Sequence, residues 1–255
     1  MFGNDLVKLA WRSEKVAVLA LDNPKVNSLC VELRNSLLEK LEEVIKTGAQ
    51  VLVLTGEGKG FSAGAHLPEL IETLRIGERA TRSWLLDGHD FVNKIAEAPI
   101  YKIALLHGFA MAGGLELALA CNFRIAVGEL RVSLPETKIK IFPGWQGTIR
   151  TRMLMPNEAM AREFYETGKE LSAKEAKDAN LLTSTFFDLE EAWKMVDNIA
   201  RVVAFGIVPA KPDNLKVAAH DSALEIERFI DKVRPREGEF ISPAIKAIEN
   251  FLSKK

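Results

Sequence analysis

Apolar positions in the first part of the chain form short continuous runs separated by a stretch of helical spacing. Residues 16–21 and 51–54 are continuous apolar runs closed by turn-type residues, which predicts two buried strands. Between them, apolar residues recur every three to four positions while glutamate and lysine take the other faces. This pattern predicts an amphipathic helix that ends at Gly48, with its apolar face made by Leu33, Leu37, Leu41, Val44 and Ile45.

The same order of elements returns once before the pattern changes. Residues 100–107, IYKIALLH, predict a strand, and the following LELALAC is typical of a buried helix. Farther on, Ser172 and Asp188 are each followed three residues later by glutamate, a signature of helix starts. From about residue 155 onward the chain therefore reads as mainly helical, with Pro209 and Pro212 interrupting it. We expect an α/β core followed by a helical region.

Composition narrows the class of protein. The 255 residues are 47% hydrophobic, enough for one large domain, and the net charge of −1 gives no general attraction to nucleic acid or anionic membranes. Cys30 and Cys121 belong to no metal-binding or disulfide pattern, and His89, His107 and His220 lack the spacing of metal ligands. No signal peptide or membrane span is visible, so we expect a cytoplasmic protein without metal or partner nucleic acid.

Two glycine-bearing loops, residues 56–65 and 108–114, each connect a predicted strand to a predicted helix. Such junctions expose backbone N–H groups, and two of them facing one point would form an oxyanion hole, although glycines there equally serve tight turns. Glu116 lies in the otherwise apolar LELALA, where a buried carboxyl needs a polar pocket or a raised pKa. Glu136 follows Pro135 at the end of a possible strand, and by itself it is equally compatible with a solvated turn.

These motifs resemble those of the crotonase superfamily. FSAGAHL resembles its FxAGADL segment, MAGGLELALAC its GGGxELAxxCD segment, and LPETKIKIFPGWQGT its PExxxGxxPGxGGT segment, in that order and at similar spacing. The N-terminal LDNPKVNSL resembles NRPxxxNAL. The resemblance implies an α/β fold with a crotonase-like ββα spiral core over residues 1–190 and a C-terminal helical region over 191–255 that serves oligomerisation.

The resemblance also implies roles for individual residues. By analogy the amides of Ala65 and Gly113 form the oxyanion hole for a thioester carbonyl, and Glu116 and Glu136 match the two acids of enoyl-CoA hydratases. The implied activity is a hydro-lyase that adds water to, or removes it from, the α,β-double bond of an enoyl-CoA. The substrate then carries CoA, and no other cofactor is expected. The remaining implied contacts are Lys25, Val26, Ala63 and Leu67 for CoA, and His66, Gly144, Trp145 and Gln146 for the acyl pocket.

Several positions depart from the family pattern. His66 replaces the usual aspartate after Ala65, and it is either a third acid/base group or a hydrogen-bonded residue at a helix start. Trp145 and Gln146 stand where small residues are usual, which should narrow or polarise the pocket. Lys59 is a second candidate for CoA phosphates, and the segment EGEFISPAIKA does not match the family's C-terminal element.

Alternatives follow from these departures. One is another crotonase reaction, such as isomerisation, thioester hydrolysis or decarboxylation, on a CoA- or acyl-carrier-protein-linked substrate. Another is a catalytically silent scaffold that binds other subunits or RNA, which the presence of both glutamates disfavours. The resemblance further implies a homotrimer or a dimer of trimers.

Overall fold

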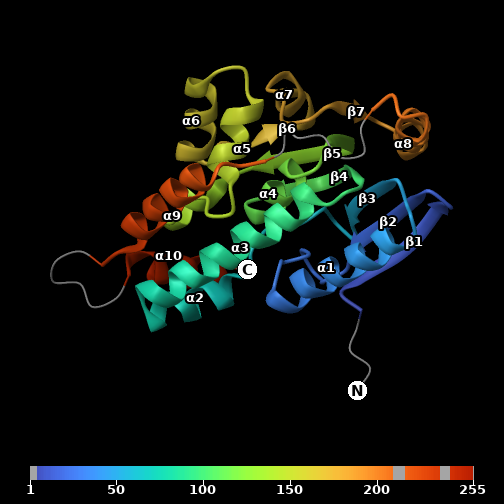
Figure 1. Ribbon diagram of the computed structural model, residues 1–255. Helices are drawn as coiled ribbons and strands as arrows, with labels where there is room; N and C mark the ends of the chain where they lie inside the picture. Colours follow the sequence, from blue (N-terminus) through green and yellow to red (C-terminus); the bar gives the residue numbers. More distant parts are fainter. Residues whose placement is uncertain (1–4, 209–215, 236–241, 255) are drawn as a thin grey trace.

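The structure is a computed structural model that describes residues 5–208, 216–235 and 242–254 (Figure 1). Its centre is one sheet with strand order β1-β2-β3-β4-β5-β6, and β7 pairs with β5. The strands are β1 Val7–Ser13, β2 Val16–Leu21, β3 Val51–Gly56, β4 Tyr101–Met111, β5 Phe123–Ser133, β6 Leu171–Ser172 and β7 Ser184–Phe186. The helices are α1 Val31–Lys46, α2 Leu67–Ile76, α3 Glu78–Glu97, α4 Gly113–Leu119, the 3₁₀ helix η1 Pro135–Ile139, α5 Gly147–Leu154, α6 Glu158–Thr167, α7 Ala173–Asp178, α8 Leu189–Ala204, α9 Ala219–Val233 and α10 Pro243–Leu252.

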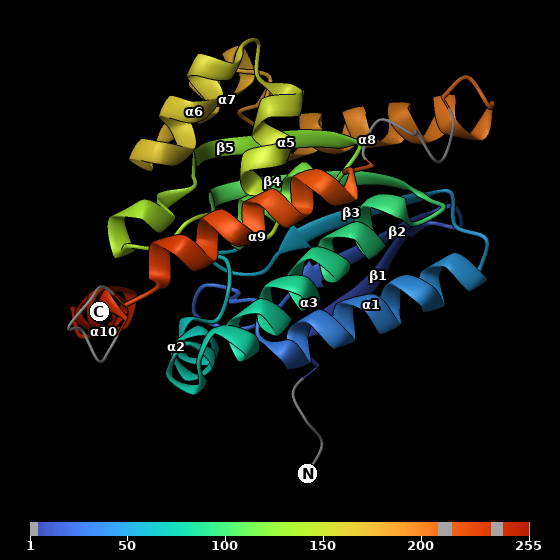
Figure 2. The ribbon, with the colours of Figure 1, turned by 60° about the vertical axis from the view of Figure 1, so that its left-hand side comes forward.

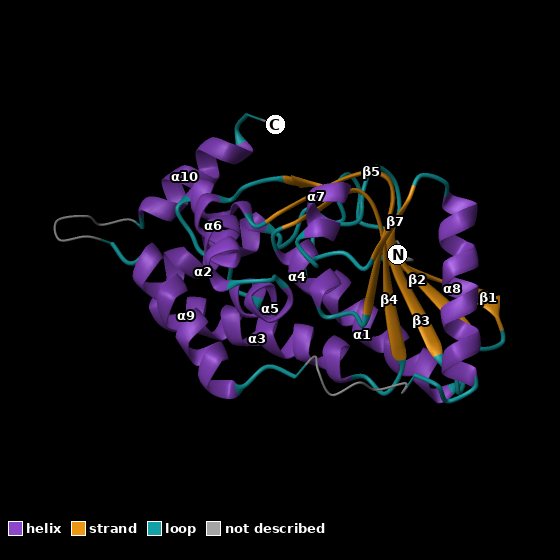
Figure 3. Ribbon diagram, turned by 90° about the horizontal axis from the view of Figure 1, so that it is seen from above, coloured by secondary structure: helices purple, strands orange, loops and turns teal. Residues whose placement is uncertain are grey.

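The sheet is largely parallel, and the strands fan out when seen from above (Figure 3). β1 and β2 form an antiparallel pair, after which β2, β3, β4 and β5 run parallel to their neighbours. The register aligns Val16 with Val51 and Val51 with Tyr101. Parallel strands covered on both faces read as continuous apolar runs, which is why β2 and β3 lack polar alternation. This layout directs the ends of β3 and β4 toward the same edge of the sheet.

Helices cover both faces of the sheet (Figure 2). On one face, α1, α3 and α4 contribute to a large apolar core that includes Leu33, Leu85 and Leu115. On the other face, α8 places Val196 and Ile199 against the apolar residues of β2, β3 and β4. Each helix hides one apolar stripe, and burying a leucine- or valine-sized side chain contributes about 1.5–3 kcal/mol.

The three C-terminal helices contact different parts of the core. α8 packs on β5 and β7, α9 on α3 and α5, and α10 on α2 and η1. The expected division after residue 190 falls within α8, which begins at Leu189. An oligomerisation role for residues 191–255 stays a prediction, and Pro209 and Pro212, together with part of EGEFISPAIKA, lie outside the described residues.

Several expected elements are confirmed. The strands at 16–21 and 51–54, the helix that ends before Gly48 and the mixed α/β class are all present. The Ser172 side chain accepts from the Glu175 amide while the Glu175 carboxylate accepts from the Ser172 amide, a complete capping box. The pattern analysis missed β1, whose outer face is largely exposed, and the short strands β6 and β7, whose two and three residues carry no periodic signal.

Candidate active site

Asn27 holds the first glycine-bearing loop, residues 56–65, by hydrogen bonds to its backbone. This side chain donates from Nδ2 to the carbonyl oxygens of Glu57, Gly60 and Phe61 at 2.9–3.1 Å. The Ser62 hydroxyl donates to the Asn27 carbonyl oxygen at 2.7 Å. These bonds hold the chain between β3 and α2 in one path, and that path brings Ala65 to the edge of a cavity.

The second loop brings the amide of Gly113 next to that of Ala65. A Cβ added at Gly113 would lie 3.2 Å from the Ala65 nitrogen, and one added at Gly64 would lie 2.7 Å from the Gly113 nitrogen. Gly113 is the first residue of α4, so its N–H has no acceptor within the helix. The preceding Ala112 has a φ of 49° and a ψ of −131°, outside the regions that L-residues favour. The amide nitrogens of Ala65 and Gly113 are therefore neighbours at the edge of the cavity.

Glu116 lies on α4, one turn after Gly113, with 2% of its surface exposed. Its Oε1 accepts hydrogen bonds from the backbone amides of Trp145 at 2.8 Å and Gly147 at 2.7 Å. Burial raises the pKa of Glu116 well above its usual value, and repulsion from Glu136 and Glu225 adds to this, while the two amide bonds act in the opposite direction. The carboxyl is thus fixed in place and holds its proton more tightly than an exposed glutamate.

Glu136 lies in η1, immediately after β5, and only 6% of it is exposed. Its Oε2 is buried and has no hydrogen-bond partner among the described residues. Burial raises the pKa of Glu136 to about 8, with a further contribution from Glu225. A solvated turn acid, the other reading of the sequence, does not describe this residue. Because Glu116 and Glu136 repel each other, they titrate as a pair that releases its protons in two steps.

Both carboxyls and both loops line one cavity of about 850 Å³, a size typical of sites for small molecules. Its wall is mainly apolar, with few polar groups among the residues that line it. The sequence-predicted site residues among them are Lys25, Val26, Ala63, Ala65, His66, Leu67, Gly113, Glu116, Glu136, Gly144 and Trp145. The structure therefore brings together eleven of the twelve predicted positions, although their individual roles stay predictions.

Gln146 is the predicted position that the structure places elsewhere. It is fully buried and is not among the described residues that line the cavity. Its Nε2 donates to Asn93 Oδ1 at 2.7 Å, and its Oε1 accepts from Arg150 Nη2 at 2.7 Å. Its backbone has a φ of 78° at the turn before α5. Its side chain is engaged with Asn93 and Arg150, and the expectation that Gln146 polarises the acyl pocket stays a prediction.

Trp145 forms one wall of the cavity and is almost completely buried. Its ring lies 5.0 Å from that of Trp84 and 6.4 Å from that of Phe91, and the Arg34 guanidinium lies over it at 5.1 Å. The six-membered edge faces Gly113, where an added Cβ would be 3.0 Å from the ring. Trp145 therefore occupies space beside the two amides.

His66 immediately precedes α2 and lines the cavity, with 39% of its side chain exposed. It makes no side-chain cap bond to the helix, contrary to the hydrogen-bonded helix-start reading. Its Nδ1 lies 3.4 Å from Glu69 Oε1 instead. Lys59, the second candidate for CoA phosphates, is not among the described residues that line the cavity.

The sequence analysis missed Glu225 of α9, which is 1% exposed. It accepts hydrogen bonds from the amides of Gln146 at 2.6 Å and Thr148 at 2.9 Å, and from the Thr148 hydroxyl at 2.6 Å. A usable signal existed, because Glu225 lies on the same apolar stripe as Phe229, just as Glu116 interrupts LELALA. Phe229 itself and residues of α10 also line the cavity, which no motif indicated.

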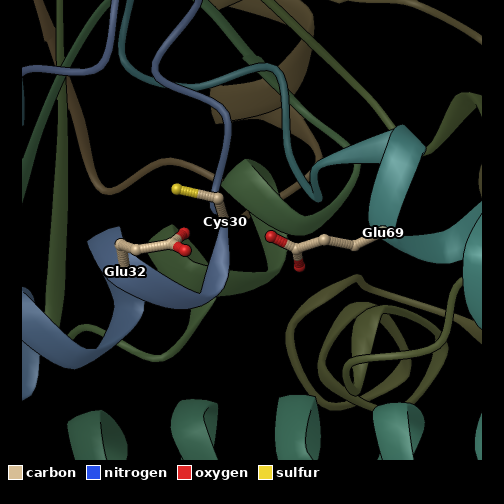
Figure 4. A group of neighbouring side chains, drawn as sticks. All are labelled: Cys30, Glu32 and Glu69. Carbon is tan, nitrogen blue, oxygen red and sulfur yellow. The ribbon is translucent and has the colours of Figure 1, made fainter.

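A second group of acids lies beside this site, in contact with His66 through Glu69. Figure 4 shows Glu32 and Glu69 reaching toward each other on either side of Cys30, close enough to share a metal ion. Arg34 Nη1 lies 3.6 Å from Glu69 Oε2, and the Val31 amide donates to Glu69 Oε1 at 3.0 Å. Burial raises the pKa of the Cys30 thiol, which disfavours a thiolate ligand. The Arg34 guanidinium balances part of the negative charge of this group.

Fold and site together define a class of protein: an α/β enzyme with two buried carboxyls beside a pair of backbone amides. The family model for enoyl-CoA hydratase/isomerase matches residues 12–204, and the chain belongs to that family, within the crotonase superfamily. A probable enoyl-CoA hydratase from Bacillus subtilis (strain 168) is 31% identical over 253 residues, covering 94% of this chain and 93% of that protein.

Solved structures show the same fold. The enoyl-CoA hydratase from Bacillus halodurans superposes with a TM-score of 0.79 at 23% identity, over 96% of this chain and 99% of that one. The enoyl-CoA hydratase from Thermoplasma volcanium superposes with a TM-score of 0.72 at 25% identity, over 99% and 98% of the two chains. Within the described parts of this chain, no helix has the length and apolar character needed to cross a bilayer.

Proposed function

We propose that this protein catalyses the reversible hydration of the α,β-double bond of an enoyl thioester of the CoA type. The observation that carries the proposal is the meeting of two buried carboxyls, Glu116 and Glu136, with the amides of Ala65 and Gly113 at one cavity. Amides that bind a thioester carbonyl oxygen make the β-carbon electrophilic and stabilise the enolate that forms when that carbon is attacked. Membership in the enoyl-CoA hydratase/isomerase family supports the same chemistry.

The proposed reaction uses the two glutamates as one acid/base pair. One carboxylate takes a proton from water while the hydroxyl oxygen bonds to the β-carbon, and the electrons of the double bond move onto the carbonyl oxygen. The other carboxyl then gives its proton to the α-carbon as the enolate collapses. One proton shared by the pair meets both needs, and the raised pKa of Glu136, about 8, suits a group that exchanges protons near neutral pH.

In the proposed complex, CoA belongs to the substrate and no further cofactor takes part. Lys25, Val26, Ala63 and Leu67 line the part of the cavity wall assigned to the CoA portion. Trp145 closes the acyl end because its ring already fills the space beside Gly113. We therefore expect compact acyl groups to react best.

A second candidate is another reaction of the same superfamily, such as isomerisation or thioester hydrolysis. The observation that favours it is His66, a titratable side chain that lines the cavity directly after Ala65 and lies 3.4 Å from Glu69. A catalytically silent scaffold would not explain why both Glu116 and Glu136 are buried beside the cavity. The cytoplasmic location and the trimeric or hexameric assembly remain predictions.

A panel of CoA and acyl-carrier-protein thioesters tests the proposal. We expect loss of the conjugated enoyl absorbance with formation of the 3-hydroxyacyl product, and Glu116→Gln and Glu136→Gln should each lower kcat by about 10²–10⁴-fold. Glu190→Gln on α8, with 80% of the side chain exposed, is the matched control. Turnover that moves the double bond or releases free thiol without adding water would contradict the hydratase assignment. Unchanged turnover in both active-site variants would contradict the assigned residues.

A further inference from the structure

Two carboxylates from distant parts of the chain hold four successive backbone amides. Glu116 of α4 accepts from Trp145 and Gly147, at 2.8 and 2.7 Å. Glu225 of α9 accepts from the two amides that alternate with these, Gln146 at 2.6 Å and Thr148 at 2.9 Å. The segment 145–148 therefore lies between two acids, and its position is determined by both.

We propose that Glu225 is a positioning residue for Glu116, because it holds residues 146–148 so that the amides of Trp145 and Gly147 remain directed at the Glu116 carboxylate. This inference rests on the proposed function only in taking Glu116 as the catalytic acid. Glu225 is not among the described residues that line the cavity, so it touches no reacting atom. Its influence passes through the backbone that it holds.

The hydrogen bonds of Glu225 are directed to the backbone and side chain of segment 145–148. Its Oε1 accepts from the Thr148 amide and from the Thr148 hydroxyl at 2.6 Å, while Oε2 accepts from the Gln146 amide. Both oxygens of the Glu225 carboxyl therefore act as acceptors. Three hydrogen bonds to one almost fully buried side chain hold the backbone of residues 146–148 in place.

Charged and titratable groups surround Glu225 from several elements. His89 of α3 places Nε2 3.3 Å from Glu225 Oε2, and Arg150 of α5 is attracted to it. Glu116 of α4 and Glu136 of η1 lie close enough for Glu225 to raise the pKa of each. Glu225 thus acts on the catalytic pair in two separable ways, by holding the backbone and by its charge.

The substitution Glu225→Gln removes the charge and turns one acceptor into a donor that opposes an amide N–H. We expect kcat to fall about 10- to 100-fold with KM nearly unchanged, because a displacement of about 1 Å at a catalytic group has an effect of this size. Loss of the negative charge lowers the pKa of Glu136, so the acidic limb of the kcat profile should move to lower pH.

Two further variants separate the contributions. Thr148→Val removes the hydroxyl bond to Glu225 and keeps the charge, so we expect a smaller loss of kcat and no movement of the acidic limb. Glu227→Gln, on the same helix and exposed, loses its pairing with Arg82 and should behave like wild type. A Glu225→Gln profile that is lowered equally at every pH would show a merely structural role and overturn the proposal.

Hydrogen exchange at the amides of residues 145–148 tests the clamp without any substrate. In Glu225→Gln we expect faster exchange in this segment, with the rest of α5 and α9 close to wild type. Unchanged exchange in the segment would overturn the proposal even if kcat fell. If the wild type fails to hydrate enoyl thioesters, the proposed function is lost, and the exchange result still decides whether Glu225 holds this backbone.

Discussion

Removing the Glu136 carboxyl should stabilise the protein increasingly as the pH rises. The pKa of this group goes from its ordinary 4.5 in the unfolded chain to about 8 in the folded protein. Between these values the folded state still binds a proton that the unfolded chain has released, so stability present below about pH 4.5 is lost as the pH rises toward 8. Glu136→Gln keeps the shape of the protonated carboxyl and has no proton to lose.

The size of the effect follows from the two pKa values. Their difference corresponds to about 5 kcal/mol for complete ionisation of the buried group. Since the carboxyl is only half ionised at pH 8, we expect the variant to gain roughly 3 kcal/mol over wild type between pH 5 and pH 8. For a chain of this size that is about 6–12 °C in melting temperature.

The assay is thermal unfolding of both proteins at intervals from pH 5 to pH 8, with Glu190→Gln as an exposed control. The informative quantity is how the difference in melting temperature between variant and wild type changes with pH. An unsatisfied amide in the variant would shift its melting temperature equally at every pH. A difference that stays constant across this range, or that falls with rising pH, would refute a raised pKa at Glu136. The same variant should be nearly inactive, so the carboxyl improves activity at the expense of stability.

Three further substitutions test the walls of the site. Gly88→Ala would place a Cβ 1.9 Å from Trp145 Nε1, so we expect a loss of about 1–3 kcal/mol in chemical denaturation and reduced turnover; wild-type values would show that α3 can shift freely. Ala112→Gly removes the side chain of a residue with a φ of 49°, a backbone conformation that favours glycine. We expect the free energy of unfolding to rise by about 1 kcal/mol or more, and the melting temperature with it. A lower melting temperature would mean that Ala112 is not strained. Trp145→Phe should raise the kcat/KM ratio of longer to shorter enoyl thioesters by about tenfold, and an unchanged ratio would place the acyl end elsewhere.

Local patterns predicted the elements whose signal lies within a few neighbouring residues. The apolar runs of β2 and β3, the amphipathic α1 and the cap at Ser172 each depend on side chains close in sequence. β1 was not predicted because it is an edge strand with one exposed face. Its sequence therefore mixes polar residues such as Lys8 with apolar ones such as Trp11. The motifs that resemble the crotonase superfamily then supplied an order of segments that periodicity alone does not contain.

The candidate site was predicted unevenly, for a physical reason. Glu116 was visible because an acid in an apolar helix has to be accommodated, and the burial of Glu136 became clear only from the packing of η1. The direction of Gln146 depends on a turn with a φ of 78° and on Asn93, 53 residues earlier in the chain. Glu225 acts across 79 residues through hydrogen bonds to a backbone, a relation that no local sequence pattern records.

The alternation of amides between Glu116 and Glu225 has a consequence for how the protein acquires activity. During synthesis the chain can form β1 to β5 and α4 long before α9 leaves the ribosome, because α9 begins only at Ala219. Until then one half of the support for segment 145–148 is missing. A nascent or truncated chain would therefore hold the amides of Ala65 and Gly113 without a fully supported Glu116 beside them. In refolding experiments, catalytic activity should return later than the burial of the central sheet.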